Sequence, residues 1–177
     1  MENEKYMRLA IQEGWKAIKE GNPPFASCLL LEDGTYICNH NTTTTNNNIL
    51  NHSEITLLNE AINEYGSDKL KNAILYTTVF PCIMCYGACC WAEIEKIVYC
   101  LDSNDLRCFD IEEKCIDIEQ IKVGNNVERS VLFYECFELF RIWNNKRKII
   151  RKLYSRNTGE KEDKVLLKES IERNENY

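Results

Sequence analysis

Apolar side chains recur along the chain at two spacings, one of three to four residues and one of two. The longer spacing covers residues 5–20, 52–66 and 131–150, and it predicts an amphipathic helix in each stretch. The Gly-Asn-Pro-Pro sequence of residues 21–24 ends the first stretch, since glycine and proline interrupt helices. The third stretch is rich in aromatic side chains, so we expect a long aromatic helix near the C-terminal end.

Short runs rich in β-branched and aromatic residues lie between these stretches and predict strands. Residues 27–31 and 35–38 flank an Asp-Gly step, which is a hairpin signal, and residues 73–79 and 97–101 form two later runs. The polar residues 39–51 are expected to form a loop that can line a pocket. Strands that alternate with helices in this way predict an α/β sandwich.

Length and composition favour one folded domain. The chain has 177 residues, and its 44% hydrophobic and 28% charged residues are ordinary for a globular protein. We expect a domain over residues 1–154 and a charged tail, helical or disordered, over residues 155–177, because large apolar clusters are nearly absent beyond Lys152.

The net charge and the N-terminal sequence indicate where the protein resides and which kinds of partner it can bind. The net charge of −6 argues against a broad nucleic-acid-binding surface, which needs a basic face. No apolar run approaches the length of a membrane span, and the acidic N-terminus lacks the apolar core of a secretion signal. These features predict a cytoplasmic protein with no membrane partner.

The chain contains 10 cysteines, which would suggest disulfides in a secreted protein. Without an export signal, Cys28, Cys38 and Cys100 are most simply small buried hydrophobic residues in apolar runs. Only Cys82 and Cys85 have the spacing of metal ligands.

A His-x-Glu triplet at residues 52–54 and a Pro-Cys-x-x-Cys run at residues 81–85 give the strongest chemical signal. His52, Cys82 and Cys85 are three candidate zinc ligands, the number that a catalytic site uses when it leaves the fourth position to water. The glutamate of the triplet is a carboxylate beside the metal that can move protons. This combination is the known signature of zinc-dependent base deaminases.

The predicted helices place these groups together. Cys82 and Cys85 are three positions apart and face the same way in a first helical turn, which Pro81 can open. The positive end of a helix dipole stabilises thiolates, the form that binds metal. His52 also stands at a helix start, and Glu54 can reach forward from that start into a pocket.

Simpler interpretations of the two motifs stay open. A Cys-x-x-Cys run can be a redox pair or half of a structural zinc site, although a structural site needs a fourth Cys or His ligand. The only other histidine is His40, on the predicted loop. Glu54 can be a surface charge, yet a structural zinc site has no use for that carboxylate.

Beyond these motifs, the chain resembles the cytidine deaminase superfamily, and within it the guanine deaminases, over most of residues 5–150. Residues 21–26 are similar to the family's glycine-rich segment before the first strand, and His40-Asn41 is similar to its His-Asn step. Residues 85–92 are similar to the guanine deaminase helix Cys-x-Gly-Ala-x-x-Trp-Ala, where tRNA adenosine deaminases carry His-Ser in place of Trp-Ala.

The resemblance implies a three-layer α/β/α sandwich with a mixed sheet of about five strands, of the cytidine deaminase-like type. It implies zinc as the cofactor and hydrolytic deamination with Glu54 as the proton shuttle. We expect substrate contacts from Phe25, Asn41, Trp91 and Asp110. Asn41 would hydrogen-bond the ring edge and Trp91 would form an apolar wall, although Trp91 is equally well explained as an ordinary core residue.

The sequence also bears on assembly. Residues 137–143 resemble the aromatic helix that guanine deaminases exchange between the two subunits of a dimer. The large apolar surface of residues 131–150 independently predicts a dimer or a larger oligomer. We therefore expect a homodimer, with exchanged C-terminal helices as one form that it can take.

Two departures from the family pattern affect specificity. Glu93 stands where both branches place arginine, and Ile111 stands where guanine deaminases carry the second acid of a Phe-Asp-Asp stretch. Guanine is the leading substrate, with other aminated heterocycles open. The main alternative is a tRNA adenosine deaminase, which the basic residues 146–148 favour, and a less favoured one is a non-catalytic zinc-binding protein.

Overall fold

Helices and strands alternate through residues 2–111, 126–129 and 131–156, which are the residues that the computed structural model describes. The elements, in chain order, are α1 (Glu2–Glu20), β1 (Ala26–Leu30), β2 (Tyr36–His40), α2 (Ser53–Tyr65), η1 (Ser67–Leu70), β3 (Ile74–Val79), α3 (Ile83–Trp91), β4 (Lys96–Leu101), α4 (Ser103–Arg107), β5 (Asn126–Arg129) and α5 (Phe133–Arg156). Contacts divide the chain into two units, Met1–Arg141 and Ile142–Tyr177, and α5 crosses the boundary between them.

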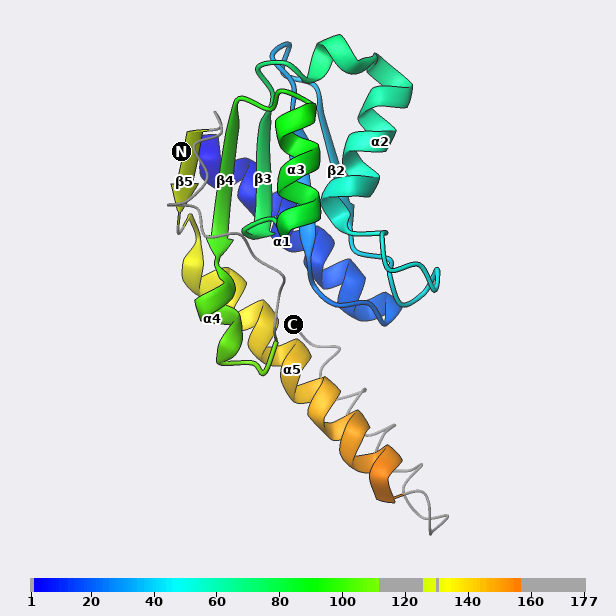
Figure 1. The fold of residues 1–177 in the computed structure, drawn as a ribbon. Coiled ribbons are helices and arrows are strands. Elements are labelled where there is room, and N and C mark those ends of the chain that lie inside the picture. The colour runs from blue at the N-terminus through cyan, green and yellow to red at the C-terminus, as the bar shows by residue number, and fades with distance from the viewer. Residues whose placement is uncertain (1, 112–125, 130, 157–177) are drawn as a thin grey trace. The chain divides into compact units, whose positions relative to one another are not determined.

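The strands form one mixed sheet in the order β2-β1-β3-β4-β5 (Figure 1). β1 pairs antiparallel with β2 and β3, whereas β3 pairs parallel with β4, and β4 with β5. α1 packs on one face of the sheet, and α2 and α3 cover the other face. The predicted three-layer α/β/α sandwich with a mixed sheet is therefore confirmed.

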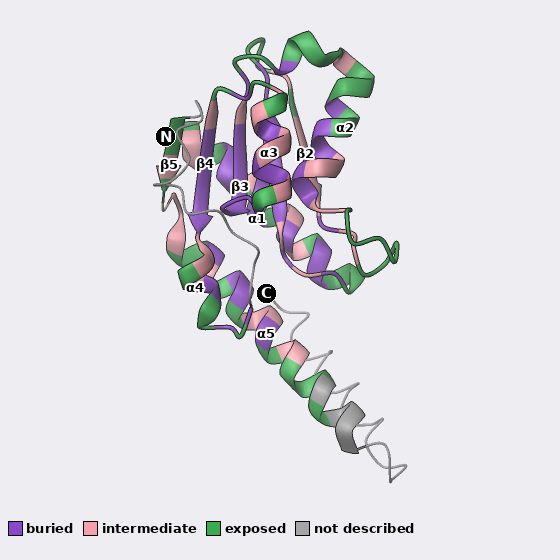
Figure 2. Ribbon diagram, in the orientation of Figure 1, coloured by how far each residue is buried: buried purple, intermediate pink, exposed green. Residues whose placement is uncertain are grey.

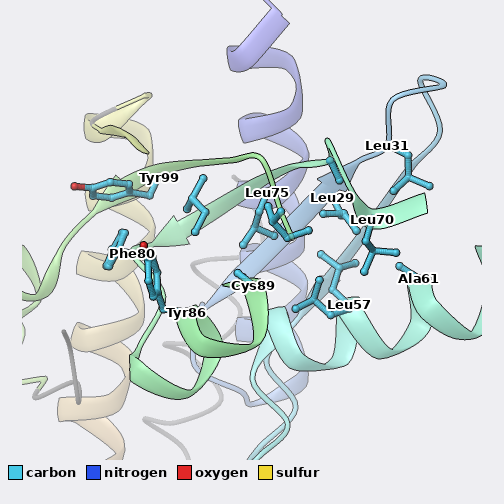
Figure 3. Packing of buried hydrophobic residues seen from close by; sticks show 14 residues of the cluster. Leu29, Leu31, Leu57, Ala61, Leu70, Leu75, Phe80, Tyr86, Cys89 and Tyr99 are labelled. Carbon is cyan, nitrogen blue, oxygen red and sulfur yellow. The ribbon is translucent and has the colours of Figure 1, made fainter. Parts of the chain in front are cut away.

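The main core lies between the sheet and the layer formed by α2 and α3 (Figure 3). Leu29 of β1 and Leu75 of β3 belong to one buried cluster with Leu57 and Ala61 of α2 and Cys89 of α3. Strand alternation turns every second side chain toward this layer, and the four-residue spacing in α2 turns Leu57 and Ala61 toward the sheet. Figure 2 shows buried residues along β3 and β4 and exposed residues on the outer side of α2.

The strand ends and helix N-termini that can form a site lie together at one edge of the sheet. β2, β3 and β4 run in the same direction, so their carboxyl ends meet at this edge, together with the amino end of β1. α3 begins directly after β3, and α2 begins after the loop that follows β2. Both helix N-termini therefore lie at this edge (Figure 1).

The β1–β2 hairpin turns at the predicted Asp-Gly step, and its register shows that the interpretation of two cysteines was wrong. The N–H of Leu31 donates to the carbonyl oxygen of Thr35 at 2.8 Å, and Gly34 takes a φ of 87° that suits glycine. Cys28 and Cys38 are opposite each other in the ladder and form a disulfide. The interpretation of both as simple buried hydrophobic residues was therefore wrong, because cross-strand neighbours follow from the hairpin register and not from each apolar run alone.

Two short elements, α4 and β5, were not predicted. The carboxylate of Asp102 caps α4 by accepting from the backbone N–H groups of Asn104 and Asp105 at 2.8 and 3.1 Å. β5 is a polar edge strand, and its Glu128 pairs with Lys96 on β4.

Two further expectations concern the tail and the membrane. The predicted tail beyond residue 156 lies outside the described residues, so the domain boundary at residue 154 stays a prediction. Within the described residues, no helix has the length and apolarity needed to cross a membrane.

Candidate metal centre and active site

His52, Cys82 and Cys85 meet at the sheet edge where α2 and α3 begin. Their ligand atoms all lie within 4.8 Å of one another, and Nδ1 of His52 is 3.6 Å from each sulfur. His52 is the N-cap of α2, Cys82 is the N-cap of α3, and Cys85 lies in the first turn of α3. Two helix N-termini converge on one point as the motifs predicted, although Pro81 precedes α3 instead of opening it.

This spacing fits a tetrahedral zinc ion. With zinc about 2.1 Å from an imidazole nitrogen and about 2.3 Å from a thiolate sulfur, a tetrahedral angle places the two ligand atoms about 3.6 Å apart. The observed separations of Nδ1 from the two sulfurs have this value. Among the residues that the structure describes, no fourth His, Cys, Asp or Glu joins the cluster. Three protein ligands are the number that a catalytic zinc site uses when water holds the fourth position.

The two thiols differ in how readily they ionise. The hydrogen bond with Cys85, with a smaller contribution from His52, lowers the pKa of Cys82 to about 4. The same hydrogen bond, together with burial, raises the pKa of Cys85 above its ordinary range. One thiolate is favoured and the second is opposed, and a cation between the two sulfurs would remove that opposition.

Glu54 is buried beside the cluster, with 6% of its surface exposed. Burial raises the pKa of its carboxyl, and hydrogen bonds from its own backbone N–H and from the Ser53 hydroxyl partly oppose the rise. The alternative that Glu54 is a surface charge was therefore wrong. A buried carboxyl with a raised pKa suits a group that must both accept and donate a proton.

Asn41 and Phe25 lie at the same edge of the sheet. Asn41 follows β2, is 3% exposed, and donates from its backbone N–H to the carbonyl oxygen of Phe25 at 2.8 Å. Its Oδ1 accepts from the amide and the hydroxyl of Thr43 at 3.0 and 2.7 Å, which fixes the side chain at the start of the loop. The ring of Phe25 packs edge-on against Phe140, with centroids 5.3 Å apart. Contact of either residue with a substrate stays a prediction.

Trp91 lies at the other end of α3. The helix has nine residues, so about 13 Å of helix separates Trp91 from the N-cap at 1.5 Å per residue. The side chain is 91% exposed and lines a surface groove between α2 and α3 with Ile55, Leu58 and Ala88. The interpretation of Trp91 as a core residue was wrong, and the residue lies away from the metal centre of its own chain.

Asp110 and Ile111 follow α4. Asp110 is exposed and takes a φ of 55°, and its N–H donates to the carbonyl oxygen of Arg107 at 3.1 Å. Ile111 is 9% exposed, so a buried apolar side chain occupies the position of the family's second acid. Glu112, the next acid in the sequence, lies outside the described residues.

Three hydroxyl residues near Glu54 were not singled out from the sequence. Ser53 lies inside the first motif, and Ser27 and Thr77 are register partners on β1 and β3. A signal was present, because alternation places Ser27 on the same face as Leu29, where an ordinary core position would be apolar. All three hydroxyl residues are buried.

The family follows from this site and from comparison with known proteins. Residues 1–101 match the family described as the cytidine and deoxycytidylate deaminase zinc-binding region. The chain belongs to this family. The match covers more than half of the deaminase and includes the three candidate ligands and Glu54, so zinc is confirmed as its cofactor.

Relatives of two kinds match this deaminase at similar identity. It is 30% identical to a tRNA-specific adenosine deaminase of Bacillus subtilis over 85% of its length and 96% of that protein. It is 29% identical to the guanine deaminase of the same organism over 82% of its length and 96% of that protein. Its fold matches the guanine deaminase from Nitrosomonas europaea with a TM-score of 0.71 at 21% identity, over 80% of its length and 84% of that chain. The chain is a zinc-dependent hydrolytic deaminase by family, and the comparisons give both substrate classes equal weight.

Proposed function

We propose that this deaminase acts on a free aminated nucleobase or a related heterocycle, and that guanine is the first substrate to test. The observation that carries the proposal is the convergence of three zinc ligands beside the buried carboxyl of Glu54. The preference for a small substrate rests on the net charge of −6, since a tRNA-binding surface needs a basic face.

In the proposed reaction, water replaces the amino group of the ring and ammonia leaves. His52, Cys82 and Cys85 would hold the zinc ion, which would make a bound water molecule more acidic. Glu54 accepts a proton from that water, passes it to a ring nitrogen, and helps the amine leave as ammonia. Asn41 can orient the ring edge through its side-chain amide, and Phe25 can supply an apolar wall.

A tRNA adenosine deaminase is the second candidate, because the chain is 30% identical to such an enzyme. The basic residues 146–148 on α5 are the feature of this chain that supports it. One of them is engaged within its own helix: the guanidinium of Arg147 lies 4.8 Å from the ring centroid of Trp143 and donates to Asn144 Oδ1 at 2.8 Å. This arrangement favours a helix-surface role for Arg147 over a phosphate contact.

We further propose that the enzyme works as a homodimer. The aromatic residues of α5 are partly covered within the chain, because the ring centroids of Phe137 and Phe140 lie 4.9 and 6.1 Å from that of Phe109. The support comes instead from α3, where Ile83 and Trp91 are 58% and 91% exposed. Large apolar side chains that share an exposed helix surface are typical of interfaces.

An ammonia-release assay tests the substrate proposal. The zinc-loaded protein is offered guanine, other aminopurines, cytosine, amino-triazines, nucleosides and an adenosine-containing tRNA anticodon stem-loop. Turnover of a free base, with none of the stem-loop, supports the proposal. Turnover of the stem-loop alone would replace it with the second candidate. Glu54→Ala protein, which should keep only a small residual rate, serves as the control in both cases.

A further inference from the structure

A series of buried hydroxyl groups leads from Glu54 into the sheet. Ser53 Oγ donates to Glu54 Oε2 at 2.9 Å and lies 2.9 Å from Ser27 Oγ. Ser27 Oγ lies 3.2 Å from Thr77 Oγ1, and Thr77 Oγ1 donates to the carbonyl oxygen of Val79 at 3.0 Å. These contacts connect the first turn of α2 to β1 and β3 through side chains alone.

The burial of these groups needs an explanation. Ser27 and Ser53 are fully buried and Thr77 is 1% exposed. A buried hydroxyl without a partner is destabilising, and alanine or valine would fill the sheet positions of Ser27 and Thr77 without that risk. Polar groups that interrupt an apolar layer are expected where function requires them. Here the series ends at the carboxylate beside the metal centre.

We propose that Ser53, Ser27 and Thr77 are positioning residues that hold the Glu54 carboxylate in the orientation its proton transfers require. The proposal rests on the proposed role of Glu54 as the proton-transfer group. A glutamate side chain turns about several bonds, and a hydroxyl fixed 2.9 Å from Oε2 restricts that rotation. Because Ser53 is itself held by Ser27, and Ser27 by Thr77, the rigidity of the sheet reaches the carboxylate.

The series can serve both forms that Glu54 takes during turnover. Towards the carboxylate, Ser53 donates its single hydroxyl proton to Oε2 and accepts from Ser27, and Ser27 accepts from Thr77 when the Thr77 hydroxyl proton turns away from the carbonyl oxygen of Val79. When Glu54 is a carboxylic acid, Ser53 accepts the hydrogen bond of the acid proton and donates to Ser27. Ser27 then donates to Thr77, and Thr77 donates to the carbonyl oxygen of Val79. Rotation of the hydroxyl protons reverses the direction without moving a heavy atom. A fixed backbone N–H in place of Ser53 could donate to Oε2 and could not accept from it.

Kinetics of single and double variants test the proposal. Ser53→Ala should lower kcat by about 10- to 100-fold, the range for loss of a hydrogen bond to a charged group, while KM and zinc content stay unchanged. Ser53→Thr restores a hydroxyl and should recover most of the loss. In a Glu54→Ala background, Ser53→Ala should change the residual rate by less than about twofold, since the two groups act as one unit. Independent, multiplicative losses would overturn the proposal.

A matched pair of valine variants separates positioning from simple stability. Thr77→Val and Thr78→Val remove buried hydroxyls from neighbouring residues of β3. The Thr78 hydroxyl contacts the backbone of Pro24 and Ala26 instead of Ser27. Both variants should unfold at lower temperature, and only Thr77→Val should lower kcat. Equal kcat losses would show that the hydroxyls merely stabilise the fold.

A crystallographic comparison does not depend on turnover. In zinc-loaded Ser53→Ala crystals, the Glu54 carboxylate should adopt a new or multiple orientation, with the backbone of α2 unchanged. A single unchanged orientation would contradict the proposal even if no substrate had been found. Absence of ammonia release from every compound by the wild-type protein would contradict the proposed function, and it would leave this structural result intact.

Discussion

At the scale of single residues, Cys82 and Cys85 show how the chain is prepared for a cation. Their hydrogen bond favours one thiolate, with a pKa of about 4 for Cys82, and opposes the second, because the pKa of Cys85 is raised by that bond and by burial. His52 Nδ1 lies at the same distance from both sulfurs. A divalent ion satisfies all three groups at once, which a disulfide or a free thiol pair would not.

The Cys82→Ala variant should lose its zinc. Removal of groups that only support a metal ligand lowers affinity by about 10- to 100-fold, and loss of a ligand itself should cost more. Elemental analysis after gel filtration should give about one zinc per chain in the wild type and far less in the variant. Cys108→Ala, which changes an exposed free cysteine, is the control and should keep its metal. A Cys82→Ala protein with full zinc would remove this residue from the site.

Ile111 should make guanine a poor substrate. The side chain of Ile111 is buried and apolar. It can neither accept a hydrogen bond from an exocyclic amine nor pass a proton to that amine. Each unpaired polar group of a bound ligand costs roughly 1–3 kcal/mol, which is up to about a hundredfold in specificity. Values of kcat/KM for guanine, other aminopurines, cytosine and amino-triazines check this. An advantage of several orders of magnitude for guanine would show that the Ile111 argument is wrong.

At the scale of elements, the sequence predicted those whose burial pattern is strong. The hairpin, α2 with its end at Gly66, and the strands that became β3 and β4 were found close to their predicted positions. β5 was missed because an edge strand has few buried positions, and its residues Asn126–Arg129 show no alternation. The three candidate zinc ligands could be singled out because both motifs are local. Ser27 of β1 carries a polar signal in a core position, but its link through Ser53 to Glu54 and its pairing with Thr77 of β3 were not predictable, because they depend on the register between distant strands.

The packing of α1 against the first turns of α5 gives a stability prediction. A Cβ added at Gly14 would lie 2.6 Å from Leu139 Cδ2 and 3.2 Å from the carbonyl oxygen of Pro24. Overpacking of a core costs about 1–3 kcal/mol, which should exceed the gain of about 1 kcal/mol in helix propensity when alanine replaces glycine. Gly14→Ala should therefore unfold at lower urea concentration.

Two further variants isolate the cause of that loss. In a Leu139→Ala background the main clash is absent, so Gly14→Ala should cost less, with a coupling energy of at least about 1 kcal/mol. Gly87→Ala is the matched control, because a Cβ at this position of α3 meets nothing within 4 Å. It should stabilise the protein by up to about 1 kcal/mol. Equal effects of Gly14→Ala in both backgrounds would exclude the Leu139 contact as the cause.

At the scale of the whole molecule, the question is which surface meets a second copy. Trp91 is 91% exposed at the end of α3, whereas Tyr134, at the start of α5, is 85% exposed. Trp91 lies on the groove between α2 and α3, and Tyr134 lies on the aromatic helix α5, so each marks one possible dimer interface. We expect the interface at Trp91, because Ile55, Ile62 and Ala88 line the groove beside it and offer apolar contacts to a ring inserted from a second copy.

Trp91→Ser should shift the protein from dimer towards monomer, and Tyr134→Ser should leave the dimer intact. A tryptophan at the centre of an interface contributes about 2 kcal/mol or more, so the dissociation constant of the dimer should rise at least about 30-fold. Sedimentation velocity over a concentration series measures this directly, with thermal unfolding to show that both variants are folded.

A monomeric wild type at micromolar concentration would contradict the dimer itself. Dissociation by Tyr134→Ser and not by Trp91→Ser would move the interface to α5, where the exchange of C-terminal helices suggested by residues 137–143 would become the better explanation. Because Trp91 lies at the far end of α3 from the candidate zinc ligands, Trp91→Ser should not change the zinc content of the protein.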